Sequence, residues 1–297
     1  MRLGIDVGGT KTAAVALDAT GTVIHEFRLP TSLGSDGVLA TIAAAIDGIC
    51  AGAGLATSGF ASVGIGIPGA VDPRTGRVSH AVNLQVEDLE LAALVGSRIG
   101  HTVRVENDVK AAALGTFHTL PGVRSMAYLN LGTGLAAGLV VDGELWRGAR
   151  GVAGEIGHIP VAEGPECPCG QRGCLELYVS GLALARQWPS TDLHPVKALF
   201  DAADAGDAKA SAVRQSFVDR VASAIRSLVL TVDVELVVIG GGISNLGDRL
   251  LSALRAALHA QGSTSAFLAS QDLPARVRIV PHDVPVAAVG AAFVGAG

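Results

Sequence analysis

The feature that most restricts the fold of this chain is a strand–turn–strand pattern that occurs twice. In each copy, two apolar runs typical of β-strands flank a short turn rich in glycine and threonine. Helical and strand patterns follow each copy, so the repeat predicts an α/β protein built from two related halves. The copies are Leu3–Val7 and Thr12–Leu17 around Gly8-Gly9-Thr10-Lys11, and Ser125–Leu131 and Leu139–Val141 around Gly132-Thr133-Gly134.

Periodicity predicts the remaining elements. A helix at 36–50 carries Val38, Ile42, Ile46 and Ile49 on one face. The other expected strands are Val23–Phe27, Ser62–Ile67, Val103–Val105, Leu236–Ile239 and Val277–Val280. The other expected helices are Val109–His118, Ala210–Leu230, one between Gly242 and Val277, and one at the C-terminus.

The length of 297 residues is enough for two domains around a cleft. We place their boundary near Glu106, which gives one α/β domain at 1–106 and a second at 107–283. The second domain contains a cysteine-bearing loop at 158–176. A C-terminal helix at about 284–297 is expected to pack on the first domain.

Composition excludes several classes of protein. Hydrophobic residues make up 49% of the chain, and the net charge of −5 argues against an electrostatic binder of nucleic acids. The longest uncharged stretch, Gly48–Val71, contains seven glycines and Pro68, so we interpret it as a helix end, a loop and a buried strand rather than a membrane span. The first strand begins without a signal-peptide pattern, which predicts a cytoplasmic protein.

One imidazole and three thiols form the most specific motif. His158, Cys167, Cys169 and Cys174 offer the four ligands of a closed tetrahedral zinc site, and the intervening glycines and prolines permit the tight turns that such a site needs. The alternative is a loop with three reduced thiols that bind nothing. The clustering favours structural Zn²⁺.

Three glycine-rich turns are candidates for binding nucleotide phosphates. Gly8-Gly9-Thr10-Lys11 offers backbone amides, a hydroxyl donor and a cation, and Asp6 at the end of the first strand can hold Mg²⁺. Gly132-Thr133-Gly134 occupies the equivalent place in the second half, and Gly240-Gly241-Gly242 follows a strand. Each alone could be an ordinary turn, but together they favour a nucleotide.

A fourth glycine motif points to a different cofactor but fails on context. Gly64–Gly69 matches the dinucleotide fingerprint, which must open a helix. Pro68, Asp72 and Pro73 instead predict turns after this strand. This context argues against a nicotinamide-dependent enzyme. A P-loop fold is excluded, because the chain has no Gly-Lys-Ser/Thr loop.

The segment Glu106-Asn107-Asp108 ends a strand and begins a helix. Helix capping explains Asn and Asp at this position, and it would also keep Asp108 ionised. A hydroxyl that accepts a phosphoryl group needs one carboxylate to take its proton, so Asp108 is the candidate base. Glu155 and Glu176 flank the cysteine cluster and could bind sugar hydroxyls, although solvated loop acids would look the same.

Together these residues resemble the ROK family, which contains bacterial sugar kinases and sugar-responsive repressors. The similarity runs from residue 3 to the C-terminal helix, and the cysteine motif is highly specific. The matching segments are Asp6-x-Gly8-Gly9-Thr10-Lys11, Glu106-Asn107-Asp108, Gly132-Thr133-Gly134, Glu155-x-Gly157-His158, Cys167-x-Cys169-Gly170-x-x-Gly173-Cys174-x-Glu176 and Gly240-Gly241-Gly242.

The resemblance implies an actin/hexokinase-like (ribonuclease H-like) fold of two domains with ATP and sugar bound between them. It implies transfer of the γ-phosphoryl of ATP to the 6-hydroxyl of a hexose, with Asp108 as base and with Mg²⁺ and structural Zn²⁺. Glucose is the first choice; N-acetylglucosamine, N-acetylmannosamine and fructose are alternatives. The implied sugar contacts are Gly69, Asn83, Asn107, Asp108, Glu155, His158 and Glu176.

The chain departs from the family pattern at three places. Val109-Lys110 puts a cation after the candidate base, Leu135-Ala136-Ala137 replaces a more glycine-rich stretch, and Gln85-Val86-Glu87 lacks the usual Pro and Trp. A repressor of the same family would carry a helix-turn-helix before the first hairpin, where only Met1-Arg2 stand here, so we expect an enzyme. We expect no nucleic-acid or membrane partner, and a homodimer or homotetramer.

Overall fold

The computed structural model describes residues 1–281 and 284–296. These residues divide into two compact units. The first unit comprises Met1–Gly122, Gly138–Ala153 and the described part of Asp283–Gly297, and the second comprises Val123–Ala137 and the described part of Gly154–His282. The division at Glu106 stays a prediction, and the expected end points 283 and 297 lie outside the described residues.

The first unit contains a five-stranded sheet in the order β3-β2-β1-β4-β8. β1 pairs antiparallel with β2 and β2 with β3, as the predicted hairpins require, whereas β1, β4 and β8 run parallel. The strands extend slightly beyond the predicted apolar runs because backbone pairing continues into polar residues. Their bounds are Arg2–Val7, Lys11–Leu17, Val23–Pro30, Ser62–Ile67 and Val103–Asn107 for β1, β2, β3, β4 and β8.

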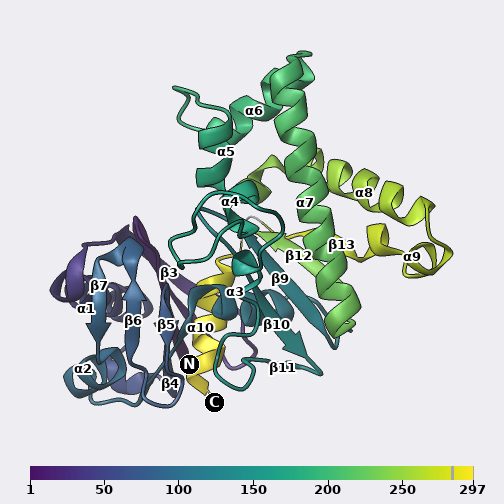
Figure 1. Ribbon diagram of the computed structural model, residues 1–297. Helices are drawn as coiled ribbons and strands as arrows, with labels where there is room; N and C mark the ends of the chain where they lie inside the picture. Colours follow the sequence, from purple (N-terminus) through teal and green to yellow (C-terminus); the bar gives the residue numbers. More distant parts are fainter. Residues whose placement is uncertain (282–283, 297) are drawn as a thin grey trace. The chain divides into compact units, whose positions relative to one another are not determined.

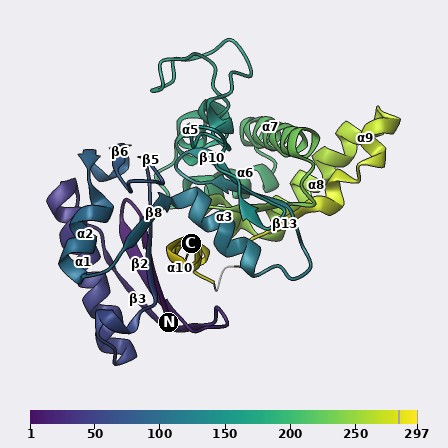
Figure 2. The ribbon, with the colours of Figure 1, turned by 90° about the horizontal axis from the view of Figure 1, so that it is seen from below.

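Helices cover both faces of this sheet (Figure 2). α1 (Gly34–Ala53) and α2 (Leu91–Ile99) lie on one face, and α3 (Asp108–His118) and α10 (Val286–Ala296) lie on the other. The buried side of α1 is the predicted one, with Val38, Ile42, Ile46 and Ile49 in the core.

α1 is also the helix that is long and apolar enough, among the described residues, to cross a membrane by length and composition. Core helices of globular domains pass the same test. Because its apolar face packs into the core of the first unit, the structure assigns α1 to that core.

A small sheet, β5-β6-β7, follows β4 directly. β5 (Ala70–Val71), β6 (Val78–Ala81) and β7 (Val86–Leu89) pair antiparallel, and the short helix η2 (Val82–Leu84) lies between the last two. β5 comes directly after β4, where the dinucleotide fingerprint would require a helix, so the predicted turns are confirmed and the fingerprint lacks its structural context. The small sheet itself was not predicted, because its strands are short and interrupted by turn residues.

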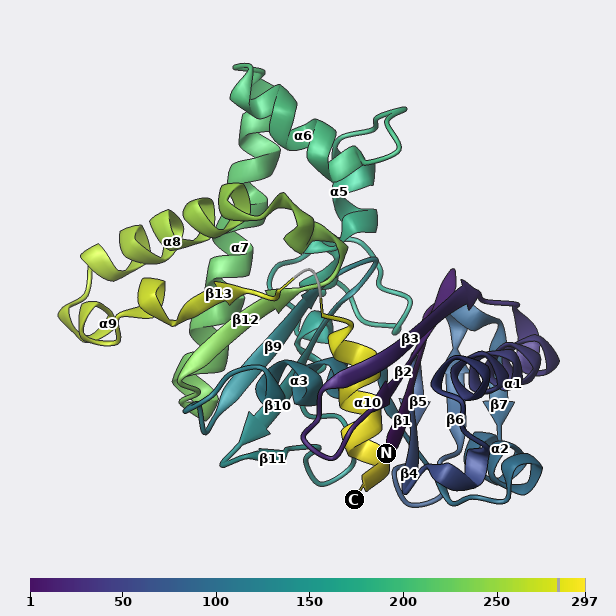
Figure 3. The same ribbon diagram turned by 180° about the vertical axis from the view of Figure 1, so that it is seen from behind.

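α10 lies so close to β1, β4 and α3 that glycines are required at the contacts (Figure 3). A Cβ added at Gly115 on α3 would lie 1.8 Å from the carbonyl oxygen of Val286, and one at Gly290 on α10 would lie 1.7 Å from that of Ala111. Neither distance is possible without a backbone shift. The two helices therefore pack backbone to backbone.

We expect Gly290→Ala to destabilise the protein by about 1–3 kcal/mol or more, because overpacking against backbone cannot be relieved by a side-chain rotation. The measurement is the free energy of unfolding in urea. Gly262→Ala is the matched control, since that glycine is also helical but its added Cβ would meet its nearest neighbour at 3.8 Å. The control should be neutral or stabilising, because alanine favours helix. Equal effects of both substitutions would contradict the packing argument.

The second sheet has the order β11-β10-β9-β12-β13, with β12 parallel to β9 and to β13. β10 begins four residues before its predicted start, at Leu135, because Ala136, Ala137 and Gly138 have little strand propensity and conceal it. The bounds are Met126–Leu131, Leu135–Val141, Glu144–Leu145, Leu236–Gly240 and Val277–Ile279 for β9, β10, β11, β12 and β13.

The long helix α7 (Ala208–Val232) confirms the predicted helix at 210–230, and it packs side by side with α8 (Asp248–Ser263) in the second unit (Figure 1). The shorter helices of this unit alternate with its loops, and several of them line a pocket. They are η3 (Ile156–His158), α4 (Glu176–Val179), α5 (Gly181–Gln187), α6 (Pro195–Asp204), η4 (Gly242–Leu246), α9 (Ala266–Ser270) and η5 (Leu273–Arg276); η1 (Thr57–Gly59) belongs to the first unit.

Candidate functional site

The Gly8–Lys11 turn closes the β1–β2 hairpin. The backbone N–H of Gly8 donates to the carbonyl oxygen of Lys11 at 3.0 Å, while the side chains of Thr10 and Lys11 are exposed. A Cβ at Gly9 would lie 3.3 Å from the carbonyl oxygen of Asn83 in η2. The structure therefore brings together the hairpin, a candidate phosphate site, and Asn83, a candidate sugar ligand from a separate segment of the chain.

Asp6 and Asp108 stand at the same edge of the first sheet. β1, β4 and β8 are parallel, so their carboxyl ends meet there, and Gly66 pairs with Asp6 on one side and with Glu106 on the other. The pKa of Asp6 is raised to about 7, chiefly by burial and then by the charge of Asp108, while Lys11 lowers it. A bound cation would relieve the repulsion between these two carboxylates, so their oxygen atoms form a ligand set that fits Mg²⁺.

Asn107 caps α3. Its Oδ1 accepts hydrogen bonds from the backbone N–H groups of Val109 at 3.0 Å and Lys110 at 3.2 Å, and its Nδ2 donates to the carbonyl oxygen of Gly69 at 3.3 Å. Gly69 has φ +103°, a conformation that favours glycine. Asp108 is the first residue of the capped helix. The capping interpretation is confirmed, and the cap fixes the position of Asp108 at the start of α3.

Two buried charges join this segment to the loop after β11. Glu106, 3% exposed, accepts a backbone hydrogen bond from Asn107 and forms an ion pair with Arg147. Lys110, 4% exposed, donates from Nζ to the carbonyl oxygen of Gly151 at 2.8 Å. Neither contact was predicted from the sequence. Arg147, between Trp146 and Gly148, was the one residue that could have indicated the ion pair.

His158, Cys167, Cys169 and Cys174 converge in the second unit, and their ligand atoms all lie within 4.8 Å of one another. Cys167 Sγ is 3.7 Å from His158 Nδ1, and Cys169 Sγ is 3.6 Å from Cys174 Sγ. Ligands at tetrahedral zinc distances are separated by about 3.5–3.8 Å. The predicted cluster is therefore confirmed, and its geometry fits zinc.

The thiols of this cluster have unequal environments. The backbone N–H of Gln171 lowers the pKa of Cys169 to about 6, whereas burial raises the pKa of Cys174 to about 12. Gly173, at φ +72°, permits the return of the loop, because a Cβ there would lie 1.7 Å from the carbonyl oxygen of Ala162. Local turn chemistry thus brings the sulfur atoms together.

Glu155 and Glu176 stand on either side of the cluster in the chain. The 3-10 turn η3 joins Glu155 to His158, whose backbone N–H donates to the carbonyl oxygen of Glu155 at 3.2 Å. Glu176 begins α4, and its Oε2 accepts from the backbone N–H of Leu135 at 2.8 Å. The second carboxylate is therefore tied to the Gly132-Thr133-Gly134 turn, which the sequence did not predict.

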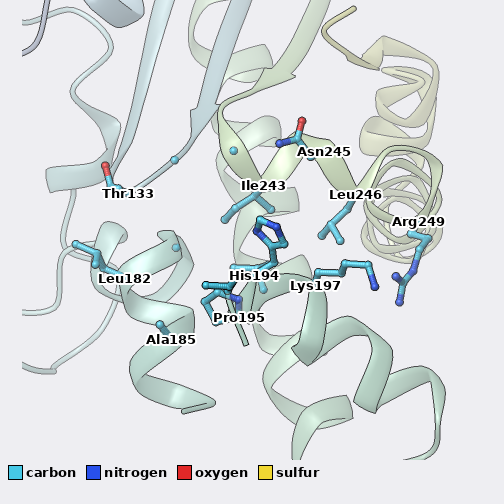
Figure 4. Close-up of a pocket in the computed structure, with 15 residues that line it drawn as sticks. Thr133, Leu182, Ala185, His194, Pro195, Lys197, Ile243, Asn245, Leu246 and Arg249 are labelled. Atoms are coloured by element: carbon cyan, nitrogen blue, oxygen red, sulfur yellow. The ribbon is translucent and has the colours of Figure 1, made fainter. Parts of the chain in front are cut away.

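A pocket of about 890 Å³ lies within the second unit (Figure 4). Two of the predicted glycine runs contribute to it, through Gly132 and Thr133 and through Gly242. Gly240 and Gly241 are packed against the protein instead, since added Cβ atoms would lie 2.0 Å from Tyr128 Oη and 2.5 Å from the carbonyl oxygen of Leu131. Two of the three predicted turns thus contribute to one cavity.

Most of the pocket wall was not predicted. Leu182 and Ala185 of α5 lie on one side, and Lys197 and Arg249 lie on the other (Figure 4). α6, which begins with Pro195 at its first turn, follows a polar stretch that concealed it. The lining residues are Gly132, Thr133, Gly181, Leu182, Ala185, Leu193, His194, Pro195, Val196, Lys197, Gly242, Ile243, Asn245, Leu246 and Arg249.

Comparison with known proteins agrees with this arrangement. A glucokinase from Halalkalibacterium halodurans is 34% identical over 275 residues, which cover 85% of this chain and 83% of that protein. An N-acetylmannosamine kinase from Vibrio cholerae is 33% identical over 270 residues, covering 88% and 90%.

A solved structure of a ROK family glucokinase from Streptomyces griseus, in complex with glucose and AMPPNP, superposes with a TM-score of 0.80. It is 29% identical, and the similarity covers 99% of each chain. The predicted two-domain, actin/hexokinase-like α/β fold with two mixed sheets is confirmed by this similarity and by the sheets themselves. Residues 2–292 match the ROK family. The chain therefore belongs to the ROK family.

Proposed function

We propose that this chain is an ATP-dependent sugar kinase that transfers the γ-phosphoryl group to the 6-hydroxyl of a hexose, with glucose as the first choice. The similarity to glucokinases supports this proposal. The observation that carries it is the pair Asp6 and Asp108 at one sheet edge, in the same unit as the glycine-rich hairpin. A phosphoryl transfer site needs a base, a cation site and hydrogen-bond donors for the phosphate oxygens.

In the first unit, Asp108 would take the proton of the hydroxyl as the hydroxyl oxygen bonds to the γ-phosphorus, while the bond from that phosphorus to the β–γ bridging oxygen breaks and ADP leaves. The capped start of α3 holds the carboxylate there. Mg²⁺, held by Asp6, would neutralise phosphate charge when bound. The N–H groups of Gly9 and Thr10 would donate to phosphate oxygens, Gly8, whose own N–H is used within the turn, would let the backbone approach the phosphate, and Lys11 would add a positive charge. Gly69, Asn83 and Asn107 would bind sugar hydroxyls.

In the second unit, Glu155, His158 and Glu176 would bind the sugar hydroxyls remote from the phosphorylated one. His158 faces the cysteine sulfurs through Nδ1, so its other nitrogen would serve the sugar. Zn²⁺ would supply a structural link that fixes the orientation of this ring. A hydrogen-bonding site of this kind rejects sugars that lack the matching hydroxyls.

The 890 Å³ pocket would take the nucleoside part of ATP, because apolar walls next to glycine turns suit a planar base joined to phosphates. Gly132, Thr133 and Gly134 would lie at the phosphate end, with Gly240, Gly241 and Gly242 as the backbone frame of the other side. We also propose that the enzyme acts in the cytoplasm as a homodimer or homotetramer, without nucleic-acid or membrane partners, and that the two domains are 1–106 with the C-terminal helix and 107–283.

A second candidate function is an N-acetylmannosamine kinase, favoured by the Vibrio cholerae relative at 33% identity. N-acetylglucosamine and fructose are further alternatives, and a sugar-responsive repressor is the alternative outside enzymes. The proposed sugar-binding residues suit the hydroxyls that these hexoses share. Discrimination between the sugars therefore depends on the space around the 2-position of the bound sugar. The atypical Gln85-Val86-Glu87 segment belongs to the part of the chain that could set this space.

The test is to measure kcat/KM for glucose, mannose, fructose and both N-acetyl sugars at saturating ATP and Mg²⁺. We expect glucose to exceed each of the others by about an order of magnitude, since a mismatched polar group costs that much or more. An N-acetyl sugar preferred over glucose by tenfold would replace glucose but keep the kinase. If none of these sugars is phosphorylated, the enzyme proposal is overturned.

A further inference from the structure

Glu176 lies between the cysteine cluster and the Gly132-Thr133-Gly134 turn. It follows Cys174 by two residues, and the backbone N–H of the intervening Leu175 donates to the carbonyl oxygen of Ile159 at 3.0 Å. Leu175 and Cys174 are both buried. The backbone that carries Glu176 is therefore held in place before its side chain makes any contact.

The Glu176 carboxylate is already engaged on one side. Its Oε2 accepts from the backbone N–H of Leu135 at 2.8 Å, and Leu135 is 3% exposed. An N–H buried in this way needs an acceptor, and a carboxylate is a strong one. A side chain on the preceding residue would displace this carboxylate, since a Cβ on Gly134 would lie 2.6 Å from the same Oε2.

The other end of the turn is held by α5, the helix that follows α4. The N–H of Gly181, at the start of α5, donates to the carbonyl oxygen of Gly132 at 2.8 Å. Within the turn, the N–H of Gly132 donates to the carbonyl oxygen of Gly134 at 3.1 Å. The turn is thus fixed at both ends, by Gly181 through backbone and by Glu176 through a side chain.

We propose that Glu176 is a positioning residue for the nucleotide as well as a sugar ligand: Oε2 holds the phosphate turn through Leu135, and Oε1 would bind the sugar. This inference rests on the proposed function, which makes the turn a phosphate site. One carboxylate would then align donor and acceptor together. Nucleotide affinity should therefore depend on Glu176 even when no sugar is present.

The test is calorimetric titration of AMPPNP with Mg²⁺ into the sugar-free protein. Glu176→Ala should raise the dissociation constant roughly tenfold, because it leaves the buried N–H of Leu135 without its acceptor. Glu176→Gln should stay within about threefold of the wild type, since its amide oxygen can accept the same hydrogen bond. Both variants should raise the KM for the sugar, because the ligand carboxylate is lost in each.

Asn83→Ala is the matched control, since Asn83 is a proposed sugar ligand of the first unit. It should raise the sugar KM without changing the AMPPNP dissociation constant. Zinc content and melting temperature of each variant show that the fold is intact.

A second set of variants tests the inference independently of Glu176→Ala. Gly134→Ala would force the Glu176 carboxylate away and should weaken AMPPNP about tenfold or more in the wild-type background. In the Glu176→Ala background the clash is absent, so adding Gly134→Ala should change affinity by less than about threefold.

Additive losses, or an unchanged dissociation constant in Glu176→Ala alongside a raised sugar KM, would overturn the positioning role while the kinase proposal stands. Wild-type protein that binds no AMPPNP would overturn both.

Discussion

Asp108→Asn is expected to lower kcat for sugar phosphorylation by a factor on the order of 10² or more, because the variant keeps the size and hydrogen-bonding shape of the side chain but has no base. The KM for the sugar should change far less. Steady-state kinetics at saturating ATP and Mg²⁺ measure both quantities. The expectation depends on the position of Asp108 at the start of α3, where Asn107 caps the helix.

Asp36→Asn is the matched control for this variant. Asp36 also lies in the first turn of a helix, α1, and its side chain is exposed. Loss of helix-end electrostatics alone would affect both variants by similar small amounts, about 0.3–1 kcal/mol in stability. Near-normal turnover in folded Asp108→Asn protein would remove Asp108 from the role of base.

Cys169→Ser is expected to abolish stoichiometric zinc binding. The wild type, purified without added zinc, should carry about one equivalent, since a complete set of three thiolates and one imidazole binds the ion tightly. With one ligand lost, the metal should dissociate on dialysis, and affinity for the sugar should fall because Glu155, His158 and Glu176 lose their common support. Elemental analysis and sugar titration measure the two effects.

Cys50→Ser is the matched control, because Cys50 is half-buried and lies outside the cluster. It should retain the metal and the sugar affinity. One full equivalent of zinc in Cys169→Ser would exclude Cys169 as a ligand. Loss of zinc without any effect on sugar binding would separate the cluster from the proposed sugar residues.

The parts of the fold that local pattern encodes could be predicted. The β1–β2–β3 hairpins, the buried face of α1 and the long helix α7 all follow from periodicity and turn residues. The first half of β10 was missed because alanine and glycine carry no strand signal, although pairing stabilises them in the sheet. α6 was missed because a polar stretch precedes Pro195. Tertiary context decides such segments.

The site divides in the same way. The cysteine cluster was predictable because its ligands are close in sequence and their chemistry is specific. The ion pair of Glu106 with Arg147 and the hydrogen bond of Glu176 with Leu135 each join residues 41 positions apart. Nothing in the local sequence marks such partners, because Glu106, Arg147 and Glu176 each resemble a solvated charge when taken alone, and the backbone N–H of Leu135 has no sequence signal. They become visible when the backbone brings them together.

The backbone-to-backbone packing of α10 has a consequence for the order in which the chain folds during synthesis. The first unit needs α10, which covers β1 and β4 and supplies Ala288, Val289 and Ala292 to a core cluster with Val15 and Leu17. These residues leave the ribosome after those of the second unit. The half whose synthesis begins first therefore cannot complete its core until α10 has been made, and until then the part of its sheet that α10 covers is open to chaperones and to aggregation.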